Sequence, residues 1–261
     1  MAAKQSRAAK ATARKPTRGR KSGGRSRKKQ PMGKAVLAWL KRPLRWLSWA
    51  VIACTGFAVL AVAVLAFLNP PTTPYIFAEG RRLGGVERQW VKLDDISPHL
   101  VRAVIAAEDA DFCLHWGFDM AEIRKAIEAG GERGASTISQ QVAKNVFLWQ
   151  GRSWPRKALE ALLTPLVEAL WSKRRIIEVY LNVAEFGEGK FGAAAAARTI
   201  FGTEPGALSR SQAARLAAVL PAPKSRSAAN PSAFVWQRAE AIMDGAETIR
   251  QDGRADCLGL G

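Results

Sequence analysis

A carboxylate stands at the end of an apolar helix face in the middle of the chain. Ser97 followed by Pro98 is a typical helix start, and aliphatic residues then recur at helical spacing as far as Ile105. Three residues further along the same stripe lies Glu108, which we therefore expect to lose contact with water. Desolvation raises the pKa of a carboxyl group, and the C-terminal end of a helix disfavours negative charge. These surroundings suit a general base that works near neutral pH.

A simpler interpretation of the same residues is a helix that ends at Glu108 and continues as a solvated acidic turn through Asp109 and Asp111. Acidic turns of this kind are ordinary surface features and carry out no chemistry. The helix alone does not separate the two interpretations. The choice depends on whether polar and cationic side chains elsewhere in the chain belong to the same site.

A second helix, expected to begin at residue 136, presents a broad polar surface. Thr137 and Gln140 have the spacing of a capping box, so these two residues have a structural explanation. Capping does not explain the polar residues that follow them, which are Gln141, Lys144 and Asn145. Gln141 and Asn145 share one helix face, and a solvated surface face would show the same pattern.

Cationic side chains gather just after this polar helix. Lys144, Arg152, Arg156 and Lys157 fall within fourteen positions, and Pro155 is well placed to begin a helix that contains Glu160. A helix-turn-helix would let several of these cations converge. The planar fork of arginine suits bidentate contacts with phosphate, and lysine adds a point charge. Taken alone, such a cluster is more often a soluble surface.

The elements that position these residues follow a basic segment and an apolar one. The chain of 261 residues has a formal net charge of +18, yet sixteen of its 40 basic residues precede residue 46 and no acid precedes Glu79. Residues 1–46 thus form a basic tail, with residues 1–30 expected to be disordered because they cannot bury an apolar core. The rest of the chain is nearly neutral.

Residues 47–68 contain no charged side chain and have the length of roughly 20 residues that a membrane-spanning helix needs. A signal peptide is the alternative, but its apolar core is shorter and lies nearer the N-terminus. We therefore expect an uncleaved, single-pass transmembrane helix, with Trp39, Trp46 and Trp49 near its start. The positive-inside rule then places the N-terminus in the cytoplasm and the chain after Asn69 outside it.

The chain beyond the membrane is expected to be mainly α-helical. Residues 69–89 are predicted to be a linker, residues 90–250 a helical domain, and residues 251–261 a frayed C-terminus. Within the domain we expect a break at Pro165, one long amphipathic helix from Leu166 to about Asn182, two alanine-rich helices and a last helix that ends near residue 249. No strand alternation is long enough for a major sheet.

The three cysteines form neither a disulfide framework nor a zinc site by their spacing. Cys54 lies inside the predicted membrane helix. Cys113 and Cys257 are far apart in the sequence, and we expect both to be free thiols.

Together these segments resemble the peptidoglycan glycosyltransferases, glycosyltransferase family 51, and most closely its monofunctional biosynthetic transglycosylases. Residues 108–119 (EDADFCLHWGFD) match the signature E-D-x-x-F-x-x-H-x-G, and residues 134–145 match G-x-S-T-I-x-Q-Q-x-x-K-N. Arg156, Lys157 and Glu160 match R-K-x-x-E, and residues 173–182 match the motif that ends in E-x-Y-L-N. Gln212 departs from the glutamate that many members carry. The resemblance covers about residues 90–240.

The resemblance implies a lysozyme-like helical fold and a bacterial enzyme of the cytoplasmic (inner) membrane, with its catalytic domain outside the cytoplasm. Its substrate would be lipid II, polymerised onto a growing glycan strand with β-1,4 linkages and release of undecaprenyl diphosphate. Cell shape and wall biogenesis would depend on it, with other cell-wall synthesis proteins as partners. No specific nucleic-acid binding is implied. No penicillin-binding domain fits, because the chain has no K-T-G motif.

The resemblance also assigns roles to residues. Glu108 would be the general base, Glu160 the second functional carboxylate, and Lys144, Arg152 and Arg156 the cations that stabilise the departing diphosphate. Asp109 would lie nearest to a divalent cation, Mg²⁺ or Mn²⁺, on the diphosphate. The sugar and phosphate contacts would be Ser136, Thr137, Gln140, Gln141 and Asn145.

Two other functions fit parts of the sequence. A lysozyme-like lytic enzyme would share the architecture and the carboxylates, but it needs no cations for a diphosphate. A membrane-anchored nucleic-acid-binding protein would act through the basic tail. Activity towards lipid II or towards finished glycan separates the first rival, and deletion of residues 1–30 separates the second.

Overall fold

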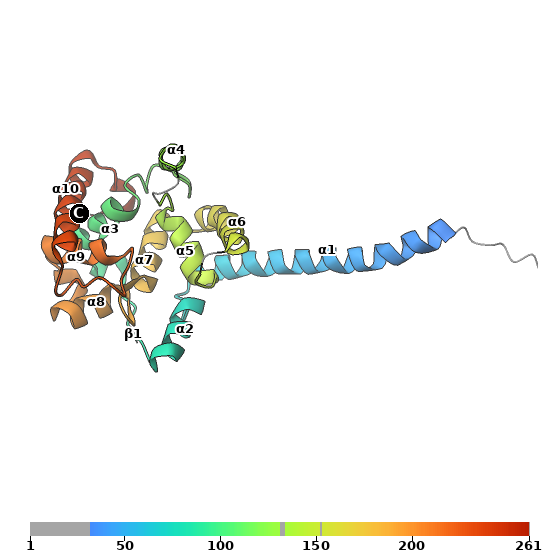
Figure 1. Cartoon of the computed structure of the whole chain (residues 1–261), viewed down its shortest axis with the longest axis horizontal. Coiled ribbons are helices and arrows are strands. Elements are labelled where there is room, and N and C mark those ends of the chain that lie inside the picture. The colour runs from blue at the N-terminus through green and yellow to red at the C-terminus, as the bar shows by residue number, and fades with distance from the viewer. Residues whose placement is uncertain (1–31, 131–133, 152, 261) are drawn as a thin grey trace, which may run out of the picture. The chain divides into compact units, whose positions relative to one another are not determined.

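The computed structural model describes residues 32–130, 134–151 and 153–260, with side chains described from residue 43 onward. Most of the predicted basic tail therefore lies outside the described residues. Two compact units are distinguished, one that ends at Ile52 and one from Ala53 to the C-terminus. Helix α1 (Met32–Leu65) begins in the first unit and ends in the second (Figure 1).

Helix α1 contains the apolar segment that the sequence predicts. Pro43–Leu65, 23 residues, is long and apolar enough to cross a membrane, and its large side chains are mostly exposed. The helix ends three residues before the predicted boundary at Leu68, and turns occupy the remainder. The structure thus provides one helix that can serve as a membrane span.

Side chains of the helical domain cap the end of α1. The last carbonyls of a helix have no partner within it. The Trp171 indole donates to the Val62 carbonyl at 2.7 Å, and the Arg175 guanidinium donates to the carbonyls of Leu65 at 3.0 Å and Leu68 at 2.7 Å. The end of the apolar helix is therefore fastened to the domain.

The predicted linker at residues 69–89 is wrong in part, because helix α2 (Pro74–Leu83) lies within it. Thr73 caps this helix by accepting from the amide of Ile76, and Gly84 ends it with a positive φ of 76°. Ile76 is its only buried apolar side chain. A ten-residue helix with so little apolar periodicity gives almost no signal in the sequence.

The domain is mainly helical, as predicted. Helices α3, α9 and α10 pack against one another, while α5 packs against α6 and α7 (Figure 1). The buried core includes Leu100, Phe112, Ile138 and Ile176. The helices are α3 (Pro98–Glu108), α4 (Met120–Glu128), α5 (Ile138–Phe147), α6 (Trp154–Leu170), α7 (Lys173–Val183), α8 (Gly192–Phe201), α9 (Arg210–Val219) and α10 (Ala233–Asp252).

The strands form only one small sheet among the described residues. β1 (Glu87–Arg88) pairs in parallel with β3 (Lys190–Phe191), which pairs antiparallel with β2 (Glu185–Gly187). The described part of the domain also contains the 3-10 turns η1 (Leu93–Asp95), η2 (Pro205–Ala207) and η3 (Asp256–Leu258). The prediction that no major sheet forms is confirmed.

The single long helix predicted from Leu166 to Asn182 is wrong. Helix α6 runs through Pro165 to Leu170, and α7 begins at Lys173. Ser172 accounts for the break, because its hydroxyl accepts from the amide of Arg175 at 3.1 Å and caps a new helix. A serine cap between two apolar runs with matching periodicity is easily missed.

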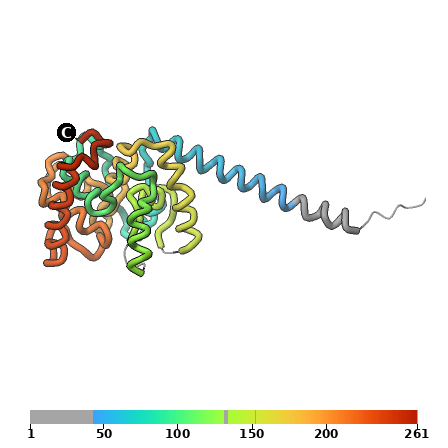
Figure 2. The backbone as a smooth tube through the Cα atoms, turned by 90° about the horizontal axis from the view of Figure 1, so that it is seen from above, coloured from blue at the N-terminus to red at the C-terminus, as the bar shows by residue number. Residues whose placement is uncertain are grey.

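The prediction of a frayed C-terminus is also wrong. Beyond α10 the chain folds back onto the domain (Figure 2), where Leu258 is fully buried. The expectation that Cys113 and Cys257 are free thiols is also wrong. The two residues form a disulfide, with their Cα atoms 5.9 Å apart. The sequence did not reveal this pair, because the two cysteines are 144 positions apart.

Candidate active site

Glu108 is the last residue of α3, and its half-buried side chain is held by a short chain of hydrogen bonds. The Gln141 amide donates to the Glu108 carboxylate at 2.8 Å, and the hydroxyl of buried Tyr180 donates to the Gln141 oxygen at 3.3 Å. Desolvation raises the pKa of Glu108, opposed by the Gln141 hydrogen bond and by the charges of Arg238 and Lys144. The predicted desolvated carboxylate is confirmed, and a solvated acidic turn is excluded for this residue.

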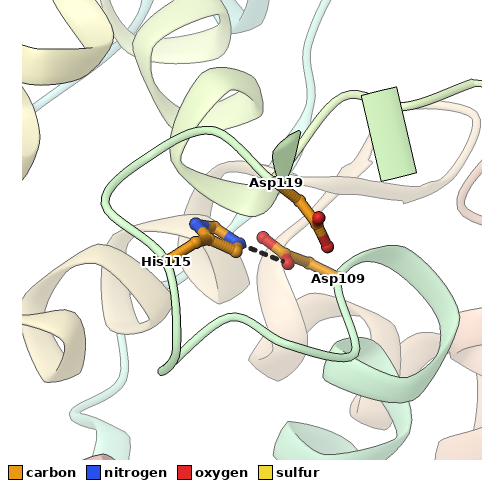
Figure 3. Close-up of side chains that lie close together, drawn as sticks. All are labelled: Asp109, His115 and Asp119. Carbon is orange, nitrogen blue, oxygen red and sulfur yellow. Dashed lines mark hydrogen bonds and ion pairs between the residues drawn. The ribbon is translucent and has the colours of Figure 1, made fainter. Parts of the chain in front are cut away.

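Asp109 follows at the helix end and is almost fully enclosed, with 1% of its side chain exposed. The His115 ring donates to one carboxylate oxygen at 2.7 Å, and the amide of Ile138 donates to the other at 2.9 Å. Figure 3 shows Asp109 and His115 facing each other, with Asp119 beside them. Asp109 therefore joins the loop of residues 109–119, here called the catalytic loop, to the start of α5.

The catalytic loop also approaches α6 closely. The Thr137 hydroxyl donates to the carbonyl of Gly117 at 2.7 Å. Gly117 has a φ of 87°, and a Cβ at this position would lie 2.7 Å from a Thr164 methyl carbon. Glycine is required here both by the backbone conformation and by the lack of space.

Glu160 forms ion pairs with two cationic side chains of α6. Its buried carboxylate accepts from Arg156 at 2.8 Å and pairs with Lys157, whose ammonium also donates to the Ser136 hydroxyl at 3.1 Å. A pocket of about 280 Å³ is lined by Ser153, Trp154, Arg156 and Lys157. Glu160 thus fixes the orientation of two cations beside an open space.

Lys144 is half-buried on α5, and its ammonium makes no hydrogen bond or ion pair with any residue in the described part of the chain. Desolvation lowers its pKa, as do the positive charges of Arg156 and Lys157, while Glu160 and Glu108 act in the opposite direction. A desolvated ammonium without a partner in the protein can regain favourable interactions by binding an anionic ligand.

The predicted site residues divide into two groups. Glu108, Asp109, Ser136 and Thr137 line a common pocket of about 300 Å³, together with Asp111, Asp119 and Glu122. Gln141, Lys144, Arg156 and Glu160 extend the site, while Arg152 lies outside the described residues.

Three of the residues predicted to contact the substrate also have structural roles. Thr137 and Gln140 form the predicted capping box of α5 and are buried. Buried Asn145 accepts from the Gln150 amide at 3.3 Å. The structure therefore accounts for these three side chains without a ligand.

Arg238 is a residue of the site that none of the sequence motifs contains. Gly245 of α10 packs on Ala106, and residues 247 and 250 lie beside His99 and Arg102, so α10 runs antiparallel to α3. Two helical turns before Gly245, Arg238 therefore lies near Glu108, on whose pKa its charge acts. Its Nε is buried without a hydrogen-bond partner among the described residues.

Replacing Arg238 by methionine is expected to move the acid limb of the pH–rate profile to higher pH. Arg238 lowers the pKa of Glu108, so its loss lets desolvation raise that pKa further. Titration of kcat for the wild type, Arg238→Met and Arg238→Lys measures the shift, and the lysine variant should retain most of the original profile. An unchanged limb in the methionine variant contradicts the assignment.

A divalent ion was expected near Asp109, and the residues there were tested for it. Ligand atoms of Asp109, His115 and Asp119 lie within 4.8 Å of one another. Asp109 contacts the His115 ring and accepts from the amide of Ile138, and Asp119 accepts from the amides of Ala121 and Glu122 at the start of α4. Protein groups thus account for the orientation of these side chains, and a divalent ion near Asp109 stays a prediction.

A helical domain with a desolvated carboxylate and clustered cations in one site suits an enzyme that transfers a group away from an anionic leaving group. Comparison with known families agrees with that class. The transglycosylase family model matches residues 78–247, and the chain belongs to this family. The match begins within α2, so the domain starts before the predicted boundary at residue 90.

Curated relatives extend over most of the chain. A protein of Jannaschia sp. (strain CCS1) is 55% identical over 214 residues, which cover 82% of this chain and 90% of the relative. A protein of Caulobacter vibrioides is 44% identical over 231 residues, covering 87% and 100%, and one of Xanthomonas axonopodis pv. citri is 49% identical over 213 residues, covering 76% and 87%. Each is named a biosynthetic peptidoglycan transglycosylase.

Proposed function

We propose that this chain is a peptidoglycan glycosyltransferase that polymerises lipid II into β-1,4-linked glycan and releases undecaprenyl diphosphate. The observation that carries the proposal is Glu108, desolvated and hydrogen-bonded by Gln141, in a site that also holds the unpaired cation Lys144. Family membership and the shared name of the relatives support it.

In the proposed reaction a sugar hydroxyl of one substrate attacks the anomeric carbon that carries diphosphate on the other. Glu108 accepts the hydroxyl proton as the new glycosidic bond forms. The bond between the anomeric carbon and the diphosphate oxygen breaks, and the electron pair leaves with the diphosphate. Lys144 and the cations held by Glu160 meet the charge that develops there, which fixed cations stabilise better than mobile water.

Arg152 is proposed as a further contact to the diphosphate, and Ser136 as a contact through its bond with Lys157. A magnesium or manganese ion is proposed only as a companion of the diphosphate itself, because phosphate oxygens are preferred ligands of these ions. Asp109 is the proposed neighbour of this ion in the protein.

Purified protein incubated separately with lipid II and with finished glycan tests the proposal. A glycosyltransferase converts lipid II into polymer and releases one lipid diphosphate for each new glycosidic bond. It leaves finished glycan intact. Fragments from finished glycan, without polymer from lipid II, would instead identify a lytic enzyme.

The proposed location is the bacterial cytoplasmic membrane, with α1 as a single span, the basic N-terminus inside and the domain outside. The apolar segment Pro43–Leu65 and the basic residues before it support this orientation. The Cys113–Cys257 disulfide supports it independently, because disulfides persist in oxidising compartments outside the cytoplasm. A substrate with a polyprenyl tail would then share the bilayer with the enzyme.

Exposed apolar residues on α6 are proposed to enter the outer leaflet. Trp154 is 88% exposed and Leu162 is 73% exposed, whereas Leu148, a neighbour in sequence, is buried. We expect bromolipid vesicles to quench the fluorescence of the wild type more than that of Trp154→Phe. Trp236→Phe is the control, because α10 lies on the other side of the domain from α6 (Figures 1 and 2). Equal quenching of wild type and Trp154→Phe would contradict insertion.

A further inference from the structure

The last residues of the chain are joined to the catalytic loop by two bonds. We call residues 253–260 the clasp. Cys257 of the clasp forms the disulfide with Cys113, and the Arg254 guanidinium pairs with the Asp111 carboxylate at 3.2 Å. Asp111 and Cys113 lie between Asp109 and His115 in the sequence. The clasp therefore holds the part of the loop that connects these two paired side chains.

The clasp is attached to the helical domain by contacts of its own, so it can restrict the movement of the catalytic loop. Leu258 is fully buried, and its carbonyl accepts from Arg174 of α7, which also pairs with Asp94 at 2.5 Å. The carbonyl of Leu260 accepts from Arg102 of α3 at 3.4 Å. The clasp is thus anchored to α7 and α3, which both belong to the helical core.

Apart from the clasp, the catalytic loop is held at its two ends by Asp109 and by bonds from Lys173 and Thr137 to the carbonyls of His115 and Gly117. Phe112 is fully buried and Asp109 is enclosed, but the side chains of Leu114 and Trp116 are 67% and 65% exposed. The loop contains no regular helix or strand between Asp109 and Asp119. A segment without regular secondary structure opens locally more easily than a helix or strand, and a cross-link to an anchored segment opposes such opening.

The clasp also lies beyond the residues that the family model matches, which end at residue 247. The motifs that carry the chemistry are all contained within the match. The clasp therefore lies outside the part of the domain that contains all of these motifs.

We propose that the clasp is a positioning element for glycan synthesis, in which Cys257 and Arg254 act through Cys113 and Asp111 to hold Asp109 and His115 against Glu108 and the start of α5. This inference rests on the proposed function. Its consequence is that full activity depends on the oxidised state of one cysteine pair.

The redox step is a thiol–disulfide exchange with a disulfide-bearing oxidant. One cysteine thiolate attacks the oxidant's disulfide and forms a mixed disulfide, and the second thiolate displaces the oxidant as a dithiol. The two cysteines lose two protons and two electrons, which the oxidant gains. A dithiol reductant such as dithiothreitol reverses the exchange.

The test compares full-length wild type with Cys113→Ser/Cys257→Ser, and uses Cys54→Ser as the matched control because Cys54 is a free thiol in α1. Rates from lipid II are measured well below the unfolding temperature of every variant, with and without dithiothreitol. We expect the double variant and the reduced wild type to lose kcat by about 10- to 100-fold with little change in KM, since small misplacements of a catalytic group have effects of this size.

Two readouts separate positioning from mere stabilisation. Hydrogen exchange at the amide of Ile138, which donates to Asp109, should become faster when the disulfide is absent. Reoxidation should restore kcat in the wild type but not in the serine variant. Arg254→Gln should show the same changes more weakly, and Arg254→Lys should be closer to wild type.

A double variant with wild-type kcat and unchanged exchange at Ile138 would overturn the proposal, even if its melting temperature fell. Failure of the proposed function would look different, because oxidised wild type would then make no polymer from lipid II.

Discussion

Replacing Glu108 by glutamine is expected to lower the rate of glycan synthesis from lipid II by about 10²- to 10⁴-fold, the contribution of a positioned general base. Glutamine has nearly the same shape, and its amide oxygen can still accept the hydrogen bond from Gln141. It cannot accept the proton of the attacking hydroxyl. The loss should therefore appear in kcat, with KM changed far less.

The same substitution should stabilise the folded protein at neutral pH. Burial raises the pKa of Glu108 above its ordinary value of 4.5, so the folded state binds a proton more tightly than the unfolded state does. The resulting penalty is absent below pH 4.5 and grows as pH rises through the folded pKa. Thermal unfolding at neutral pH should show a higher melting temperature for Glu108→Gln, and the difference should vanish in acid.

Glu122→Gln is the matched control for this experiment. Glu122 lines the same pocket, but its carboxylate is exposed and pairs with Lys125 at 2.8 Å. The change removes one negative charge from the pocket without touching the proposed base. Its rate should stay close to that of the wild type, and a loss comparable to that of Glu108→Gln would show that pocket charge, not proton transfer, is responsible.

Replacing Lys144 by methionine is expected to lower kcat by about 10²- to 10³-fold, the usual loss when one preorganised group that stabilises developing charge is removed. Methionine has a similar length and no charge. Lys144 has no ion-pair partner in the described part of the chain, so its removal leaves no buried carboxylate unpaired. The protein should fold with undiminished stability.

Steady-state kinetics with lipid II checks this second prediction, and Lys125→Met, on α4, is the control. If Lys144→Met raised KM and left kcat unchanged, Lys144 would bind the ground state and the transition state equally. That result would contradict its proposed role on the leaving diphosphate.

Local patterns in the sequence predicted the surroundings of Glu108 and the start of α5. Helical spacing from Leu100 placed Glu108 on a desolvated face, and the burial of α3 confirms it. The Thr137–Gln140 capping box formed as predicted, since both bonds join residues three positions apart. Interactions within one or two helical turns are encoded by adjacent residues, and such features can be predicted from a single sequence.

Features that depend on distant residues could not be predicted in this way. The Cys113–Cys257 disulfide and the position of Arg238 near Glu108 both require α10 and the clasp to pack against the region around α3. Nothing near Arg238 in the sequence marks it as part of a site. The break at Ser172 was missed for another reason, because a single cap outweighed continuous apolar periodicity.

The central claim is that Glu108 acts as an ionised base in its own desolvated surroundings, and the pH dependence of kcat tests it most directly. With lipid II at saturation, wild type should lose activity in acid with a midpoint above 4.5, because protonated Glu108 cannot accept a proton. The residual activity of Glu108→Gln should lack this acid limb. An acid limb of the same midpoint in both proteins would contradict the account.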